Sequence, residues 1–200
     1  MALATPLINI LIRTSNRPQL FARCLESIQE QAYKNVRIIV GYDNDQALNY
    51  VPSFIEAIPV HANKAIPFYY DLYCNQLKKY VDEGWFFFLD DDDYLHDRGA
   101  LKNIAAHLAE PGAVICQFLR NSWPKPVDSA IKAGKIVEGK IGLPSLVLHS
   151  KYKDVADLDG YKSGDYRYIL SVTTMVKTKF IALVLVETDR RSHGIMEKNL

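Results

Sequence analysis

The sequence has almost no net charge and few cysteines. Its 200 residues include 24 basic and 23 acidic side chains, giving a formal net charge of +1. This balance excludes the broad positive field that is typical of proteins binding nucleic acid or anionic membranes. The cysteines lie far apart and follow no spacing typical of a zinc or redox site, so we expect reduced, buried thiols at Cys24, Cys74 and Cys116.

Long apolar runs are also absent. The longest such run late in the chain, 180–186, is far shorter than a membrane span, and residues 1–6 lack the basic start of a signal peptide. We therefore expect a cytoplasmic protein without a membrane span. An apolar content of 48% over this length suffices for one core, so we expect a single domain over 1–200. Its charged end, 195–200, is compatible with a longer protein.

Glycine-rich phosphate-binding motifs are missing as well. The sequence contains neither GxGxxG nor GxxxxGK followed by Ser or Thr, which excludes the dinucleotide-binding fingerprint and the P-loop. A bound phosphate would therefore have to be held by side chains and a metal ion.

The most informative segment that is present is an apolar run followed by four aspartates. Residues 85–89 are all large and apolar, which predicts a strand buried on both faces, and Asp90, Asp91, Asp92 and Asp93 follow at its C-terminal end. Side chains alternate along a strand, so Asp90 and Asp92 are expected on one side and Asp91 and Asp93 on the other. Mutual repulsion of these carboxylates favours a bound divalent cation, and oxygen ligands suit Mg²⁺ or Mn²⁺. The alternative is a solvated acidic turn.

Strand and helix patterns alternate along the chain, which predicts an α/β sandwich with a mostly parallel, mixed sheet flanked by helices. Polar residues follow three strands, at 13–17, 42–45 and 90–93, where ligands bind in open α/β sheets. Residues 143–149 fit a helix or a strand, and 121–142 a long loop. The expected strands are 7–12, 36–41, 58–61, 85–89, 113–119 and 180–187, and the expected helices are 17–32, 67–84, 97–111 and 165–175.

These residues resemble the GT-A glycosyltransferases, in particular family 2, over roughly 7–97. The matching features are the first strand, its Asn-Arg-Pro loop and the Cys-Leu-x-Ser-Ile helix, the acidic-Asn pair after the second strand, and the Phe-Leu-Asp-x-Asp-Asp motif. The first strand, its loop and the helix lie at 8–28, the strand with the acidic-Asn pair at 38–44, and the aspartate motif at 88–93. The asparagine of the family's third helix is matched by Asn75. The resemblance implies a Rossmann-like, three-layer GT-A fold, with a nucleotide-sugar donor half at 1–97 and an acceptor half at 98–200.

The resemblance also implies a function: transfer of a hexose from a UDP-sugar to a hydroxyl of a glycan or glycoprotein, with inversion. Asp43 would accept a hydrogen bond from the base, and Asp92 would ligate Mn²⁺ or Mg²⁺ at the diphosphate, with a late histidine, His193, nearby. The implied nucleotide-binding residues are Thr14, Arg17, Asp43, Asn75, Asp90 and Asp91.

The implied catalytic base is Asp165, at a predicted helix start. The family places a Glu before this Asp, whereas this sequence has Gly164. Asp157 and Asp159 are therefore alternative bases, and Asp165 could instead be a helix N-cap. A retaining transferase and a sugar-nucleotide-binding module without transfer stay open. A nucleotidyltransferase is disfavoured because the loop after the first strand has no glycine.

A second, fainter resemblance has no motif of its own. The chain is similar to the N-terminal domain of the large glycosyltransferases encoded by chlorella viruses, which would place it in the host cytoplasm.

Overall fold

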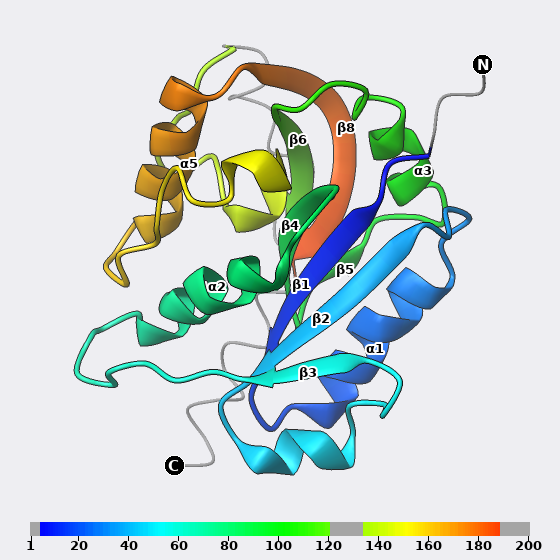
Figure 1. Cartoon of the computed structure of the whole chain (residues 1–200), viewed down its shortest axis with the longest axis vertical. Helices are drawn as coiled ribbons and strands as arrows, with labels where there is room; N and C mark the ends of the chain where they lie inside the picture. Colours follow the sequence, from blue (N-terminus) through cyan, green and yellow to red (C-terminus); the bar gives the residue numbers. More distant parts are fainter. Residues whose placement is uncertain (1–4, 121–133, 189–200) are drawn as a thin grey trace.

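A computed structural model describes residues 5–120 and 134–188 of the chain (Figure 1). Its strands are β1 (Ile8–Thr14), β2 (Val36–Tyr42), β3 (Glu56–Pro59), β4 (Trp85–Asp90), β5 (Tyr94–Leu95), β6 (Ala113–Arg120), β7 (Leu146–His149) and β8 (Thr178–Thr188). Its α-helices are α1 (Pro18–Gln29), α2 (Leu72–Leu77), α3 (Ala100–Ala105) and α5 (Gly164–Met175). Short 3-10 helices are η1 (Asp45–Asn49), η2 (Tyr69–Asp71), η3 (Lys78–Tyr80), η4 (Leu143–Ser145) and η5 (Ser150–Tyr152).

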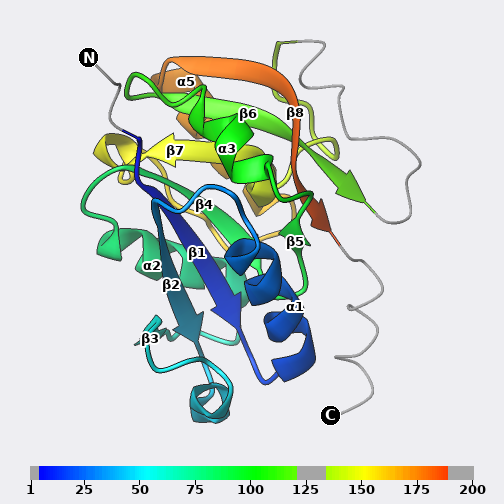
Figure 2. The same cartoon turned by 90° about the vertical axis from the view of Figure 1, so that its right-hand side faces the viewer.

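The strands form one mixed sheet. Within the described residues it has eight strands in the order β3-β2-β1-β4-β7-β6-β8-β5. β3, β2, β1 and β4 are parallel, and β6 is parallel to β8. The antiparallel pairs are β4 with β7, β6 with β7, and β5 with β8. Figure 2 shows β7 between β4 and β6, where it joins the two parallel parts. The predicted mixed α/β sheet is therefore confirmed.

Helices cover both faces of the sheet. Alternate residues of β1 point to opposite sides: Ile10 packs in the cluster that contains α1 and α3, and Leu11 in the cluster that contains α2 and α5. β4 alternates in the same way, with Phe87 on the first side and Phe88 on the second. Figure 1 shows these helix pairs on opposite sides of the sheet. The predicted three layers follow from this alternation of large apolar side chains.

The strand before the four aspartates is as buried as its sequence predicts. Residues Trp85, Phe86, Phe87, Phe88 and Leu89 are each at most 4% exposed. Gly84 precedes them with φ of +76°, and a Cβ there would lie 2.5 Å from the Leu7 carbonyl oxygen. Only glycine allows the chain to enter β4 this close to β1.

Two predicted helices are shorter than expected. The segment 67–84 is helical over 69–80, where η2, α2 and η3 follow one another in place of a single α-helix. Asp71 at the junction of η2 and α2 pairs with Arg13, and buried Lys78 at the start of η3 donates to the Ala156 carbonyl. The segment 97–111 is helical only over α3. Its start is delayed because the Asp97 carboxylate accepts a hydrogen bond from the Gly99 N–H at 2.7 Å, which forms a local turn.

Smaller differences concern strands. β3 begins two residues before the predicted 58–61 and ends at Pro59, which the sheet tolerates because β3 is an edge strand. Residues 143–149 divide into η4 and β7, so both readings of that segment hold in part. The two-residue strand β5 was not predicted, because it is too short to show a period. In residues 5–120 and 134–188 no helix is both long and apolar enough to cross a bilayer.

Candidate active site

One cavity of about 460 Å³ opens at the carboxyl ends of β1, β2 and β4. Thr14, Arg17 and Asp43 line it from the ends of β1 and β2, and Asp90 and Asp92 from the end of β4. The opposite wall comes from η2, the end of β6, η4 and the start of α5, where Asp165 lies. The structure therefore brings together most of the predicted site residues, in the place expected for an open α/β sheet.

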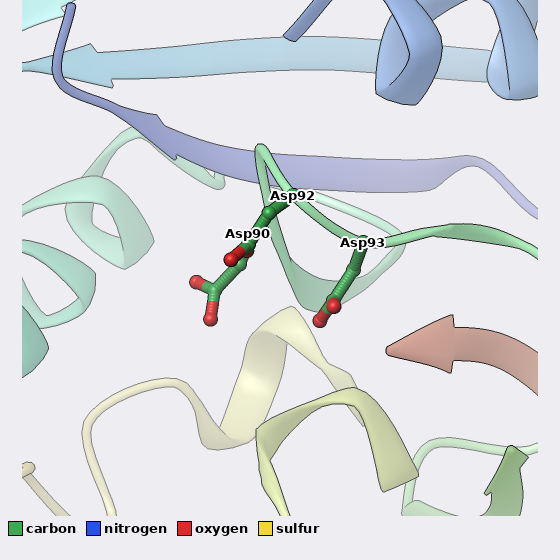
Figure 3. Close-up of side chains that lie close together, drawn as sticks. All are labelled: Asp90, Asp92 and Asp93. Carbon is green, nitrogen blue, oxygen red and sulfur yellow. The ribbon is translucent and has the colours of Figure 1, made fainter. Parts of the chain in front are cut away.

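The four aspartates form a turn and do not alternate as a strand would. The chain turns after Asp90, and the Asp93 N–H donates to the Asp90 carbonyl at 3.0 Å. As a result Asp90, Asp92 and Asp93 point to one side, with ligand oxygens within 4.8 Å of one another (Figure 3). The expected pairing of Asp91 with Asp93 is wrong, because alternation ends where the strand ends.

Asp91 is buried away from the cavity wall. It is 0% exposed, accepts a hydrogen bond from Thr14 Oγ1 at 2.6 Å, and pairs with Arg17 through both carboxylate oxygens. Burial raises the pKa of Asp91 to about 7, against the opposing effect of Arg17. Arg17 also reaches Asp92 at 3.3 Å. Asp91 is thus placed to hold Thr14 and Arg17 in position, and direct contact with a ribose does not fit its burial.

Arg13 is a site residue that the sequence analysis did not single out. Its Nε and Nη2 donate to the two oxygens of Asp90 at 2.5 and 3.0 Å, and its Nη1 donates to Asp71 at 2.8 Å. Its guanidinium lies 4.9 Å from the centre of the Tyr70 ring. Burial raises the pKa of Asp71, and Arg13 opposes this effect. The signal that was available is position: Arg13 lies at the end of β1, beside the end of β4.

The acidic turn has the donor set of a divalent metal site. Three carboxylates converge, and Mg²⁺ and Mn²⁺ prefer such oxygen ligands. An ionised carboxylate accepts several hydrogen bonds, so pairing of Asp90 and Asp92 with arginines leaves acceptor capacity on each. The predicted ligand Asp92 lies in this group, and the predicted ligand His193 lies outside the described residues.

Asp43 follows β2 directly and lines the cavity. Its Oδ2 accepts a hydrogen bond from the Tyr73 hydroxyl at 3.1 Å. Its Oδ1 is shielded from water and has no hydrogen-bond partner among residues 5–120 and 134–188. An acceptor of this kind is unfavourable unless a donor reaches it.

Asn75 does not line the cavity. Its amide nitrogen donates to the Leu158 carbonyl at 2.8 Å, and its amide oxygen accepts from the Leu158 N–H at 2.9 Å. The amide nitrogen and the amide oxygen of Asn75 therefore both bind the backbone of the loop before α5 and stabilise that loop. The predicted nucleotide contact of Asn75 does not fit this geometry, and a sequence alone does not show which backbone a side-chain amide will meet.

Asp165 is the second residue of α5 and lines the cavity. Its Oδ1 accepts from the Tyr166 N–H at 2.7 Å, and within the described part of the chain no hydrogen bond engages Oδ2. Burial raises the pKa of Asp165, with Arg120 opposing. The N-cap position belongs to Ser163, so the alternative interpretation of Asp165 as an N-cap is wrong.

The alternative bases are engaged elsewhere. Asp157 pairs with Lys78 at 2.7 Å and is mostly exposed. Asp159 forms a two-point ion pair with Arg167, at 2.7 and 2.8 Å. Neither lines the cavity. A Cβ at position 164 would lie 3.0 Å from Asp159 Oδ1, so a side chain there would require the Asp159 carboxylate to shift slightly.

Comparisons with known proteins support the fold through structure alone. No family model and no curated protein matches the sequence. S. aureus TarS 1-349 in complex with UDP-GlcNAc matches with a TM-score of 0.72 at 15% identity, over 92% of this chain and 59% of that one. The mannosyltransferase PcManGT from Pyrobaculum calidifontis, in complex with GDP-Man and Mn²⁺, matches with a TM-score of 0.64 at 14% identity, over 91% and 56%.

The chain thus spans less than two thirds of the length of these solved structures. No viral protein is among the matches described, so the similarity to chlorella-virus enzymes stays a prediction. The eight-stranded mixed sheet of the described residues, with helices on both faces, matches that of the glycosyltransferases above. The protein has a GT-A fold.

Proposed function

We propose that this protein is a metal-dependent glycosyltransferase that moves a hexose from a UDP-sugar to a hydroxyl of a glycan or glycoprotein acceptor, with inversion. The observation that carries the proposal is the shared cavity, which has the acidic turn on one side and the half-buried carboxylate of Asp165 on the other. Fold neighbours crystallised with UDP-GlcNAc and with GDP-Man and Mn²⁺ are consistent with it.

In this proposal, residues 1–97 bind the donor and residues 98–200 the acceptor. Asp43 accepts from the base, while Thr14 and Arg17 border the ribose and diphosphate. Asp92, with Asp90 and Asp93, holds Mn²⁺ or Mg²⁺. When bound, the metal would neutralise charge that develops on the departing diphosphate.

Asp165 acts as the general base. Its Oδ2 takes the proton of the acceptor hydroxyl as the acceptor oxygen attacks the anomeric carbon. The bond between that carbon and the β-phosphate oxygen breaks, and its electron pair leaves with UDP. Attack from the face opposite the diphosphate inverts the anomeric centre. The raised pKa of Asp165 suits this role, because a stronger base accepts the proton more readily.

Calorimetric titration of UDP, GDP and CMP tests the donor site. Binding of UDP should require Mn²⁺, disappear in EDTA, and be lost in Asp92→Ala. The matched control is Asp82→Ala, which removes an exposed carboxylate just before β4 and should leave UDP binding unchanged. If no nucleotide binds with Mn²⁺ present, the proposal fails.

A turnover assay distinguishes a glycosyltransferase from a sugar-nucleotide-binding module. A transferase should release UDP from UDP-sugars when a glycan acceptor is present, and should produce a glycoside of inverted configuration. Metal-dependent UDP binding without release under any acceptor would favour the sugar-nucleotide-binding module, and a retained configuration would favour a retaining enzyme.

A further inference from the structure

Tyr161 is an exposed aromatic residue in the wall of the cavity, on the same side as Asp165. It is 55% exposed and lines the cavity. Its carbonyl accepts a hydrogen bond at 2.8 Å from the N–H of Gly164, the residue directly before Asp165. Its hydroxyl has no hydrogen-bond partner in the part of the chain that the structure describes. The side chain of Tyr161 is therefore accessible to a ligand that reaches Asp165.

The backbone that carries Tyr161 is held on both sides. The Tyr161 N–H donates at 3.0 Å to Asp159, whose carboxylate forms a two-point ion pair with Arg167 at 2.7 and 2.8 Å. Gly160, which has φ of +71°, accepts a hydrogen bond at its carbonyl from the Phe68 N–H at 3.0 Å. A ring on such an anchored loop loses little backbone freedom when a ligand packs on it.

The position of this ring indicates the chemistry of its ligand. Single exposed aromatic side chains are common on protein surfaces and carry no function by themselves. Tyr161 differs because it lies in a cavity, four positions before a carboxylate that also lines that cavity. The combination offers an apolar flat face beside a hydrogen-bond acceptor.

A pyranose ring presents the matching groups. Its C–H bonds form an apolar face that packs on an aromatic ring, and its hydroxyls lie around the edge, where they donate to a carboxylate. An open-chain polyol has the same hydroxyls without a fixed apolar face. A serine side chain has a hydroxyl and no ring. The cavity wall therefore favours a sugar ring over these other hydroxyl compounds.

We propose that Tyr161 is the platform of an acceptor subsite for a pyranose: its ring stacks on the C–H face of the sugar while Asp165 meets the hydroxyl that reacts. This inference rests on the proposed function and narrows the acceptor to a sugar. It adds Tyr161 as a residue that contacts the acceptor and does not contact the donor.

The test measures binding of simple sugars to the protein loaded with UDP and Mn²⁺, by saturation-transfer NMR and titration. The probes are the methyl pyranosides of glucose, galactose, mannose and N-acetylglucosamine, compared with sorbitol and N-acetylserine methylamide. At least one pyranoside should bind the wild type, and sorbitol and the serine derivative should not.

Three variants then assign the binding to the ring. Tyr161→Ala should weaken pyranoside binding about tenfold, because the apolar contact is lost. Tyr161→Phe keeps the ring and should retain the wild-type affinity to within about threefold, the contribution of one exposed hydroxyl. The matched control is Tyr80→Ala, which removes a tyrosine that is 41% exposed and lies outside the cavity, and it should leave the affinity unchanged.

Several results would overturn the inference. They are absence of pyranoside binding to the wild type, an unchanged affinity in Tyr161→Ala, and an equal loss in Tyr80→Ala. Weaker binding of UDP or of a UDP-sugar to Tyr161→Ala would show that the ring contacts the donor, which also overturns it. In each of these cases UDP still binds the wild type with Mn²⁺, and the proposed function stands. Absence of all nucleotide binding to the wild type would instead refute the proposed function.

Discussion

At the scale of single residues, Arg13 and Arg17 pair with three of the four aspartates of the acidic turn. Arg13 holds Asp90 on the cavity side, and Arg17 holds Asp91 in the interior while reaching Asp92. Four adjacent carboxylates would otherwise repel one another strongly. The arginines make this turn compatible with a folded protein before any ligand arrives.

The pair of Arg17 with Asp91 should contribute to stability in a way that a double mutant reveals. Arg17→Met removes the cation that opposes the raised pKa of Asp91, and at pH 8, where this carboxyl is ionised in the unfolded chain, it should lower the free energy of unfolding by about 3 kcal/mol in urea titrations. The further change Asp91→Asn removes the stranded charge and should restore at least half of the loss. A double variant that is no more stable than Arg17→Met would contradict the pairing.

Asp165 should control the acidic limb of the pH profile. Only its ionised form accepts a proton, and its pKa is raised by burial. We therefore expect kcat/KM to fall as pH drops through a value above the ordinary range for an aspartate. Asp165→Asn should lower kcat about 10²-fold or more while UDP binding persists.

The control for this change is Asp159→Asn, whose carboxylate pairs with Arg167 off the cavity. It should keep wild-type kcat. Stability gives an independent readout: because the folded pKa of Asp165 is raised, its ionisation destabilises the fold as pH rises above the unfolded value. Asp165→Asn should thus not lower Tm at neutral pH. A large drop in Tm would indicate a structural role instead.

At the scale of elements, the site depends on how closely β1 and β4 approach. Gly84 permits this approach, since a side chain there would meet the Leu7 backbone. Gly84→Ala should therefore destabilise more than Gly139→Ala. Both glycines have positive φ, +76° and +72°, but nothing lies within 4 Å of a Cβ at Gly139.

We expect Gly139→Ala to lower the free energy of unfolding by about 1 kcal/mol, from the positive φ alone. Gly84→Ala should lower it by a further 1–3 kcal/mol, roughly the effect of overpacking. Urea unfolding monitored by circular dichroism measures both. Equal losses of unfolding free energy in the two variants would mean that the close approach of Gly84 to Leu7 does not contribute to stability.

The elements also show what a sequence can and cannot predict here. The apolar strands and their polar ends were predictable, because burial on two faces requires continuous large side chains, as in β4. The side-chain partners along 67–84 were not, because they are distant in sequence: Arg13 pairs with Asp71, and the Leu158 backbone hydrogen-bonds with Asn75. The same holds within the site. The position of Asp43 could be predicted from the end of β2, but the hydrogen bond that it accepts from Tyr73 could be identified only in the folded structure.

At the scale of the whole molecule, the three cysteines are confirmed as buried, free thiols. Each is at most 2% exposed, and burial raises the pKa of Cys74 and of Cys116 to about 12. Two lie among the side chains of one face of the sheet and one on the other. Their reactivity therefore reports on both layers of the core at once.

We expect a thiol reagent at pH 8 to modify none of the cysteines in the native protein and all three after unfolding in urea. The rate should follow unfolding and should fall when UDP and Mn²⁺ are added, because a ligand that binds only the folded state stabilises it. Rapid modification of one thiol in the native protein would show that a layer of the core opens independently.

The ion pairs of the acidic turn join residues far apart in the chain. Arg13 and Asp90 are 77 positions apart, and Arg17 and Asp91 are 74 apart. Closing loops of that length is entropically costly, so such contacts form only after local structure and nearer contacts exist. We therefore expect completion of the cavity to be a late event in folding. If the proposed function holds, the first appearance of nucleotide binding during refolding would time the docking of β4 beside β1.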